Sequence, residues 1–303
     1  MNRNEVLAID LGQSGTSLRM NNLNLHSPRG KHAGEDSLDA LDAVFQSLTT
    51  SETIHADCVA LSCTGLYGQV PNPQKYLELC SKYFGSTKVS VIDDGFASFI
   101  GSLNGSDGTA LTIGGGVVSV AGLNGKYAHR DGLGSTFGDE GGGFWLGRNA
   151  ISKALASQQN RILDPQMKEY FKEEIAAYYA LDVRDGAQAQ TLAINTAKKV
   201  LDAADLGIAS AVAIVNKGAF LLAQTVISTW LGVTGGSNGE MKIVVQGGPA
   251  KNKNYVEAIL RNVKVKLPNA TLIESAGDNL DGAVWIAENL PNDVPPFLKW
   301  ASQ

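Results

Sequence analysis

The chain has 303 residues, of which 44% are hydrophobic and 18% charged, so it can bury a large core and is not a disordered chain. Thirty acidic and 25 basic side chains leave a net charge of −5, which argues against a nucleic-acid or membrane-surface partner, because both need a basic face. The 34 glycines gather in clusters, which predicts glycine-rich loops rather than a collagen-like repeat.

Targeting and metal signals are also lacking in the sequence. There is no uninterrupted apolar stretch of about 18 residues, and Asp10 interrupts the first apolar segment, so we expect neither a membrane span nor a signal sequence. The cysteines, Cys58, Cys63 and Cys80, form no CxxC pair and fit reduced thiols. The histidines show no HxxxH spacing and predict no zinc site. A cytoplasmic protein is the expectation.

The first hundred residues predict alternating strands and helices. Val6–Leu11 is an apolar strand that ends in a glycine- and serine-rich loop, and Ser17–Met20 completes a hairpin. Apolar residues at helical spacing predict a helix over 38–48. The next elements are a strand at Cys58–Ser62, a helix at Tyr76–Phe84 and a strand at Lys88–Ile92. Strands that end in polar or glycine residues around a helix are typical of a parallel or mixed α/β sheet.

The strand, glycine loop and strand pattern then occurs a second time. Thr109–Ile113 and Val117–Leu123 flank three glycines, and the turn Asn124-Gly125 leads into a strand at Lys126–Arg130. This repeated pattern predicts two similar α/β domains, with the boundary between them in the glycine- and serine-rich segment 101–108. We place the N-terminal domain at 1–106 and the C-terminal domain at 107–303, with the last helix free to pack back on the first domain.

The remainder of the chain is mainly helical. The segment 208–231 is apolar on nearly all sides and should form a buried helix. The other expected elements are helices at Ile151–Ala156, Asp164–Leu181, Ala187–Ala204, Asn252–Asn262 and Asp281–Asn289, and strands at Met241–Gln246 and Ala270–Glu274. Regular structure should end within 291–296.

Carboxylates follow two of the predicted strands. Asp10 precedes the loop Gly12-Gln13-Ser14-Gly15-Thr16, whose backbone N–H groups and hydroxyls can contact phosphate, while the acid can hold Mg²⁺ directly or through water. A plain hairpin with a structural aspartate is the alternative. Asp93 and Asp94 alternate in direction, so one of them can face a site as a general base. A solvated turn remains the other interpretation of this pair.

Three more glycine segments bear on ligand binding. Gly114, Gly115 and Gly116 weaken a strand without a packing gain, which favours close approach of a phosphate over a simple turn. Gly247 and Gly248 lie between a strand and a helix, where the base and ribose of a nucleotide can lie against bare backbone.

The densest glycine segment is 132–147, which also holds two acids and two aromatic residues. A sugar offers hydroxyl donors and one flat apolar face, so this composition suits a carbohydrate. Phe144 and Trp145 fit stacking on a ligand and core packing equally well. The candidate sugar-binding residues are Gly132, Gly134, Asp139 and Glu140.

Together these motifs resemble the actin-like ATPase superfamily, which includes sugar kinases, actin and heat-shock chaperones. The segment GDEGGGFWLG at 138–147 resembles the GDEGSG(Y/F)xxG motif of the N-acetylglucosamine kinase-like branch. That branch is grouped with the ATPases that activate benzoyl-CoA reductase and hydroxyglutaryl-CoA dehydratase. The resemblance covers about 6–290 and includes Asp281-Gly282-Ala283 at the start of the last helix.

The resemblance implies two ribonuclease H-like (actin-like ATPase) α/β domains with a cleft between them, and an ATP-dependent kinase of an amino sugar. N-acetylglucosamine or glucosamine would receive phosphate on its 6-hydroxyl. Asp94 would be the catalytic base, and Asp10 would position Mg²⁺ through water. The residues implied to bind ATP are Gly12, Ser14, Gly15, Thr16, Gly114, Gly115 and Gly116 at the phosphates and Gly247 and Gly248 at the adenosine. The resemblance is compatible with a homodimer and with a monomer.

The sequence departs from the family pattern in three places. Such kinases commonly have Gly-Thr-Gly-Ser where this chain has Gly114–Val117, and the asparagine that holds the sugar has no match within 24–34. No cysteine follows Cys80, so the iron–sulfur chemistry of the activator ATPases is not expected. The alternatives are an ATPase that couples nucleotide state to a protein partner and a sugar-binding protein without turnover. No Lys or Arg lies between Asp131 and Leu146, which favours a neutral or amino hexose over an anionic one.

Overall fold

The chain forms two compact units in a computed structural model that describes residues 6–32, 34–48, 54–182, 186–236, 239–290 and 294–303. Unit 1 comprises Met1–Ala110, Val120–His129 and Glu274–Gln303, and unit 2 comprises Leu111–Ser119 and Arg130–Ile273. The units thus divide the chain differently from a single boundary after residue 106. The C-terminal segment returns to unit 1, and so does the tip of one hairpin.

Unit 1 is built on a six-stranded sheet in the order β11-β5-β4-β1-β2-β3. Strands β1, β4 and β5 run parallel, so their carboxyl ends meet at one edge, where Leu11, Cys63 and Asp93 lie in register. The strands are β1 (Val6–Leu11), β2 (Thr16–Met20), β3 (Leu23–Ser27), β4 (Cys58–Cys63), β5 (Lys88–Asp93) and β11 (Leu298–Ser302). β11 was not expected, because residues beyond 296 carry no strong strand signal; it pairs antiparallel with β5.

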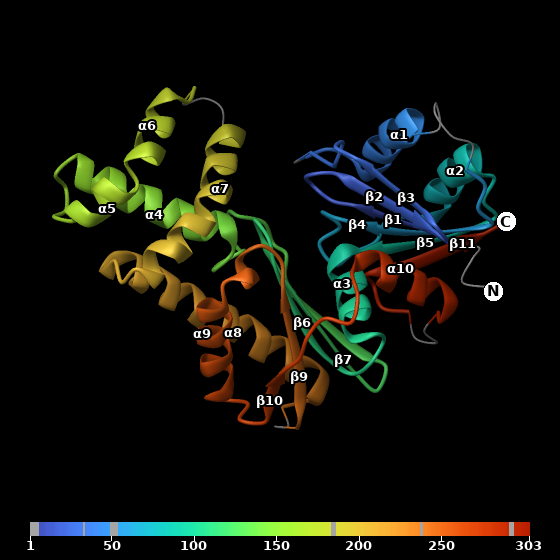
Figure 1. Ribbon diagram of the computed structural model, residues 1–303. Coiled ribbons are helices and arrows are strands. Elements are labelled where there is room, and N and C mark those ends of the chain that lie inside the picture. Colours follow the sequence, from blue (N-terminus) through green and yellow to red (C-terminus); the bar gives the residue numbers. More distant parts are fainter. Residues whose placement is uncertain (1–5, 33, 49–53, 183–185, 237–238, 291–293) are drawn as a thin grey trace. The chain divides into compact units, whose positions relative to one another are not determined.

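Two helix pairs cover the faces of this sheet (Figure 1). α1 (Ser37–Leu48) and α2 (Pro73–Phe84) lie on one face, and α3 (Asp94–Leu103) and α10 (Asn279–Glu288) lie on the other. α3 and α10 cross with their backbones in contact: a Cβ on Gly282 would lie 1.9 Å from the Ala97 carbonyl oxygen. A Cβ on Gly101 would lie 1.9 Å from the carbonyl oxygen of Asp278. Glycine at both positions is therefore required for this crossing.

α3 was not predicted from the sequence, because its glycines and phenylalanines are weak helix formers. Asp93 caps it by accepting a hydrogen bond from the Gly95 N–H at 3.0 Å. The helix then buries Phe96 and Phe99 against Tyr127, with the rings of Phe96 and Tyr127 5.1 Å apart, centroid to centroid. These aromatic contacts explain why the hairpin segment Val120–His129 belongs to unit 1.

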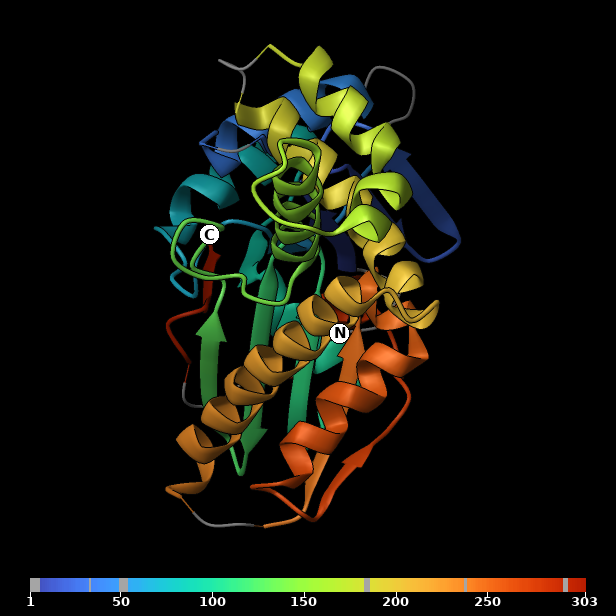
Figure 2. The same ribbon diagram turned by 90° about the vertical axis from the view of Figure 1, so that its left-hand side faces the viewer.

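The second sheet has the strand order β10-β9-β6-β7-β8. Its strands are β6 (Gly108–Ile113), β7 (Val117–Leu123), β8 (Lys126–Asp131), β9 (Met241–Gln246) and β10 (Ala270–Leu272). The helices of unit 2 are α4 (Gly143–Gln158), α5 (Pro165–Tyr170), α6 (Lys172–Ala180), α7 (Gly186–Asp205), α8 (Ala209–Thr234), the 3₁₀ turn η2 (Pro249–Lys251) and α9 (Lys253–Lys264). α8 and α9 lie side by side over this sheet (Figure 2).

Two helices of unit 2 differ from the prediction. α4 begins at Gly143 rather than Ile151, because the N–H groups of Gly143 and Phe144 donate to the Gly114 and Gly115 carbonyls at 2.8 and 2.9 Å. The helix expected over 164–181 is broken at Phe171, whose fully buried ring separates α5 from α6. Phe144 and Trp145 thus lie in the first turn of α4 rather than in a loop.

α8 confirms the buried apolar helix expected near 208–231. Within the described ranges it is the one helix long and apolar enough to cross a membrane. Its buried side chains, including Leu222, Val226 and Trp230, pack inside unit 2 against α4, α7 and α9. This burial is the pattern of a core helix in a globular unit. The two sheets with their helices confirm the α/β class.

Candidate active site

Asp10 lies one residue before the end of β1 and is held by two side chains distant in sequence. The Ser62 hydroxyl donates to its Oδ1 at 2.7 Å, and the Asn279 amide donates to the same oxygen at 3.1 Å. Oδ2 accepts no hydrogen bond from the residues that the structure describes. Burial raises the pKa of Asp10 and the two hydrogen bonds oppose that rise. One carboxylate oxygen is therefore oriented and free to bind a cation.

Asp94 is the first residue of α3, directly after β5. Burial raises its pKa from 3.8 to about 7; the neighbouring charge of Asp93 and that of Asp10 act in the same direction. Hydrogen bonds from the Thr64 side chain and the Gly95 N–H lower the pKa. A carboxyl group that titrates near neutral pH can accept a proton and lose it again, which is the property of a general base.

Asp93 has a structural role. It is 2% exposed, and its carboxylate caps α3, accepts from the Gly68 N–H at 3.0 Å and contacts His129 Nε2 at 3.2 Å. The two adjacent acids thus have different surroundings: Asp93 is fully engaged inside unit 1, while Asp94 is half-buried at the strand edge.

The loop between β1 and β2 is closed on itself. The Gly12 N–H donates to the Gly15 carbonyl at 3.0 Å, and Ser14 is exposed at the tip. The Thr16 side chain is fully buried and donates to the Arg29 carbonyl at 2.7 Å. The Thr16 hydroxyl, which we expected at a phosphate, therefore already has a partner inside unit 1, and Ser14 is the exposed hydroxyl of the loop.

In unit 2, the three glycines after β6 form a tight turn docked on α4. The Gly114 N–H donates to the Gly116 carbonyl at 2.9 Å, while the carbonyls of Gly114 and Gly115 accept from the first turn of α4. Within the described chain, the N–H groups of Gly115 and Gly116 make no hydrogen bond. They are the free donors of this turn and can approach phosphate oxygens.

Asp139 fastens the same turn from the segment before α4. Its Oδ1 accepts from the Val117 N–H at 2.9 Å, and its own N–H donates to Asp131 Oδ1 at 2.9 Å. The residue is 8% exposed, and burial raises its pKa. Glu140 is exposed, and Gly132 and Gly134 lie in the loop just before it, with φ of 69° and 80°. Of the two acids, Asp139 is mainly structural and Glu140 is the more accessible.

A pocket of about 500 Å³ opens beside the glycine turn of unit 2. Gly114, Gly115 and Gly248 form part of its wall, whereas Gly247 does not line it. Gly247 instead holds φ at 102° so that the end of β9 packs on β6, where a Cβ would lie 2.1 Å from the Ile113 carbonyl oxygen. The opposite wall comes from α7 through Ile194, Asn195, Ala197, Lys198, Leu201 and Asp202.

The α7 wall could not be identified from the sequence, because apolar residues at helical spacing look the same in a pocket wall and in a core. Asn279 was not predicted either, since it reaches Asp10 from 269 positions along the chain. The one local signal for Asn279 was its place beside the Asp281-Gly282-Ala283 motif.

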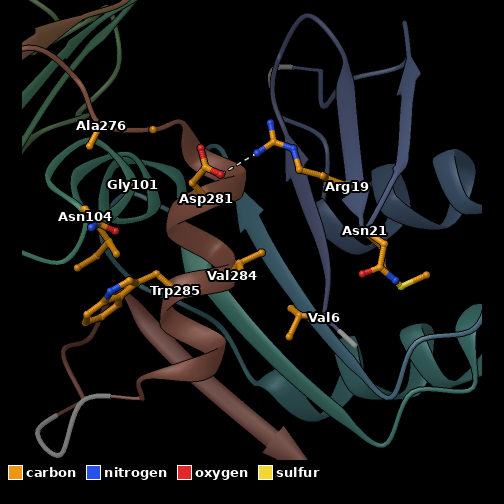
Figure 3. Close-up of a pocket in the computed structure, with 12 residues that line it drawn as sticks. Val6, Arg19, Asn21, Gly101, Asn104, Ala276, Asp281, Val284 and Trp285 are labelled. Atoms are coloured by element: carbon orange, nitrogen blue, oxygen red, sulfur yellow. Dashed lines mark hydrogen bonds and ion pairs between the residues drawn. The ribbon is translucent and has the colours of Figure 1, made fainter. Parts of the chain in front are cut away.

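Arg19 links two elements of unit 1, the strand β2 and the helix α10 (Figure 3). Its guanidinium pairs with Asp278 at 2.6 Å and with Asp281 at 2.9 Å, which joins β2 to the first turn of α10. A pocket of about 380 Å³ lies next to this clamp, walled partly by Trp285 and Asn104. Because Asn279 follows Asp278, the clamp also fixes the amide that orients Asp10.

A site made of protein ligands alone is not seen, since the described residues contain no group of three or more His, Cys, Asp and Glu side chains suited to a metal. The charge of Asp10 nevertheless raises the pKa of Asp94, and neither carboxylate has a cationic partner in the described chain. This donor set fits Mg²⁺, which usually takes one or two carboxylates and completes its shell with water and substrate phosphates.

Comparison with models of known protein families gives no match, and neither does comparison with the sequences of curated proteins. Solved structures do match, over nearly the whole chain. A protein from Chromobacterium violaceum assigned as an N-acetylglucosamine kinase has a TM-score of 0.67 at 18% identity, covering 93% of this chain and 98% of its own. A protein of the same assignment from Porphyromonas gingivalis gives 0.64 at 16% identity, covering 94% and 99%.

A ROK family glucokinase from Streptomyces griseus, solved with glucose and AMPPNP, matches with a TM-score of 0.58 at 15% identity, covering 93% of this chain and 98% of the glucokinase. These similarities establish the fold. The chain has a two-unit α/β fold similar to that of these kinases, as the sequence motifs predicted.

Proposed function

We propose that the protein is an ATP-dependent kinase of a sugar. The observation that carries this proposal is Asp94, a half-buried carboxyl group with a pKa near 7, beside the oriented carboxylate of Asp10 at the edge of the first sheet. The fold shared with sugar kinases supports it. Within this class we propose an amino sugar, N-acetylglucosamine or glucosamine, as the acceptor and the 6-hydroxyl as the acceptor group.

We assign the nucleotide to the pocket of unit 2. Its volume of about 500 Å³ suits a nucleoside, and Ile194, Ala197 and Leu201 offer apolar contacts to a base. Gly248 presents bare backbone to the same pocket, while Gly247 lies outside the lining and packs against the backbone of Ile113. In unit 2 we propose the free N–H groups of Gly115 and Gly116 as phosphate contacts. In unit 1 we propose Gly12, Ser14 and Gly15, in the loop between β1 and β2, as phosphate contacts.

Phosphoryl transfer then needs a base, because a sugar hydroxyl is a weak nucleophile. Asp94 accepts the proton of the acceptor hydroxyl while the hydroxyl oxygen forms a bond to the γ-phosphorus of ATP. The bond between the γ-phosphorus and the bridging oxygen of the β-phosphate breaks, which releases ADP. Asp10 would hold Mg²⁺ through water, and the ion would neutralise charge on the phosphates. Ser62 and Asn279 keep Asp10 in one orientation for that contact.

For the sugar we retain Gly132, Gly134, Asp139 and Glu140 as candidate contacts. Glu140 is exposed and can accept from sugar hydroxyls, whereas Asp139 offers only Oδ2 because Oδ1 holds the Val117 N–H. A small-molecule sugar and ATP are the partners that we propose, in the cytoplasm where both occur, with no nucleic-acid or membrane partner and with a homodimer left open.

The test is ADP release, measured with a coupled assay in the presence of ATP and Mg²⁺. Glucosamine, N-acetylglucosamine, glucose and N-acetylmuramate are supplied one at a time, with a reaction lacking sugar as the control. We expect turnover that depends on one of these sugars and yields a 6-phosphate. Equal ATP hydrolysis with and without every sugar would instead support an ATPase coupled to a protein partner. Sugar binding without ADP release would support a binding protein.

A further inference from the structure

The pocket of about 380 Å³ beside the Arg19 clamp lies entirely within unit 1 (Figure 3). Its walls come from the start of β1, the end of β2, the last turn of α3, and α10 with the segment before it. Val6 lines the pocket, whereas Asp10 lies four residues further along β1, about 13 Å away at roughly 3.3 Å per residue. None of the residues that we propose for ATP, Mg²⁺ or the acceptor sugar lines it. The pocket is therefore separate from the proposed kinase site.

Two walls of this pocket are fixed by contacts with the backbone around the end of α3. A Cβ on Gly105 would lie 2.3 Å from the Trp285 indole, so the ring rests directly on the backbone after the helix. The Ala276 N–H donates to the Ser102 carbonyl at 2.9 Å, which holds the segment before α10 against the same helix. The pocket is thus formed before any ligand arrives, as small-molecule sites usually are.

The lining combines an aromatic ring with hydrogen-bonding groups. Trp285 and Val284 are half-buried and expose part of their surface to the pocket. The Asn104 amide and the Asp281 carboxylate line the same space. An indole beside amide and carboxylate groups suits a ring with one apolar face and polar substituents, which is the chemistry of a pyranose. A volume of about 380 Å³ has room for one such ring.

The charge around the pocket is negative. Arg19 is the one basic residue among the described residues that line it, and its guanidinium pairs with two carboxylates, Asp278 and Asp281. One positive and two negative charges leave this clamp with a net charge of −1. A cationic ligand would balance that charge and would also be attracted to the face of the indole, whereas an anionic ligand would be repelled.

We propose that this pocket binds a hexosamine with a free amino group, at a site separate from the acceptor site. The sugar ring lies against Trp285, the ammonium group faces Asp281, and a hydroxyl hydrogen-bonds to the Asn104 amide. The ligand thereby touches the clamp that precedes Asn279, the residue that orients Asp10. The inference does not rest on the kinase function, because binding here needs neither ATP nor Mg²⁺.

The first test is a titration with glucosamine in the absence of ATP, followed by tryptophan fluorescence. Glucose, which has a hydroxyl group in place of the ammonium group, is the matched control ligand. For wild type we expect a saturable change with glucosamine and at least about tenfold weaker binding of glucose. Trp285→Phe should remove most of the change, because the other tryptophans of the chain, Trp145, Trp230 and Trp300, do not line this pocket.

Two substitutions at Val284 test the charge directly. A long side chain at this half-buried position can extend into the pocket and towards solvent. Val284→Lys should weaken glucosamine binding and Val284→Glu should keep or strengthen it, so that the two dissociation constants differ by at least about tenfold. Each variant is the control for the other, since both lose the same valine.

Asn104→Gly provides a milder variant that does not disturb the helix end. Asn104 has φ of 48°, a conformation that glycine adopts readily, so the substitution removes the amide and keeps the backbone. It should weaken glucosamine binding by about 2–10-fold, the usual range for one hydrogen bond.

Three results would overturn the inference: equal binding by Val284→Lys and Val284→Glu, an equal response to glucose, or a fluorescence change that Trp285→Phe retains in full. The last of these would assign the signal to glucosamine at the acceptor site. Failure of the kinase function would show differently, as a normal fluorescence titration with glucosamine and no ADP release with any sugar.

Discussion

Replacing Asp94 with Asn should abolish phosphoryl transfer and at the same time stabilise the fold. The native environment raises the pKa of Asp94 from 3.8 to about 7, so the folded state binds its proton more tightly than the unfolded state does. Stability contributed by this group is therefore complete below pH 4 and is lost as the pH rises towards 7. Asn cannot ionise, and its carbonyl can still accept from Thr64 and the Gly95 N–H.

The magnitude follows from the size of the pKa rise. At roughly 1.4 kcal/mol per pH unit, a rise of about three units corresponds to at most about 4 kcal/mol above pH 7. The same carboxylate is expected to contribute about 10²–10⁴-fold to the rate as a general base. For wild type, kcat should accordingly rise with pH and level off above about 7, where Asp94 is ionised.

The assay is unfolding by denaturant at pH 4, 6 and 8, together with ADP release at pH 8. The free energy of unfolding of Asp94→Asn should equal that of wild type at pH 4 and exceed it at pH 8. Asp93→Asn is the matched control: it should lose stability at both pH values, because Asp93 caps α3 and holds Gly68 and His129. An Asp94→Asn protein that is no more stable than wild type at pH 8, or that keeps a tenth of the activity, would refute the reasoning.

Three further outcomes are expected. Asp10→Ala should raise the Mg²⁺ concentration needed for half-maximal ADP release by at least about tenfold, and an unchanged Mg²⁺ titration would remove Asp10 from the site. Gly282→Ala should destabilise the protein by about 1–3 kcal/mol in denaturant unfolding, because the new methyl group meets the Ala97 carbonyl at 1.9 Å. Leu201→Glu should raise KM for ATP by about tenfold or more with little change in KM for the sugar, since it places a charge in the apolar wall of the nucleotide pocket. Fluorescence titration with a nucleotide analogue measures nucleotide binding independently. Unaltered nucleotide binding would show that the adenine base does not lie against Leu201.

The strands were well predicted because their residues are β-branched and apolar and their ends are marked by glycine and acids. β1, β7 and β9 occupy the expected ranges, and Asp94 does follow a strand in register with β4. Local composition also identified the two glycine loops. These features depend on residues within about ten positions of one another, which is the range over which a sequence pattern reports directly on structure.

Features that depend on distant contacts were not predictable in this way. α3 is a helix because Phe96 and Phe99 are buried among aromatic residues from other segments, against the weak helix preference of its own residues. The Asn279 amide orients Asp10 by a hydrogen bond to its carboxylate, and the Val117 N–H holds the carboxylate of Asp139 in the same way. In each case the deciding partner lies on another element, so the motif alone predicts the chemistry of a residue but not its hydrogen bonds.

The backbone contact between α3 and α10 has a consequence for how the protein can change over time. Asp94 is the first residue of one helix, and Asn279, which orients Asp10, is the first residue of the other. Where these helices cross, glycine brings carbonyl and Cα atoms together, and no side chain separates them that a mutation could enlarge or shrink. The distance between the carboxylates of Asp10 and Asp94 therefore does not depend on the size of the surrounding core side chains. Apolar residues of unit 1 can be exchanged during evolution while the crossing of α3 and α10, and with it this distance, stays constant.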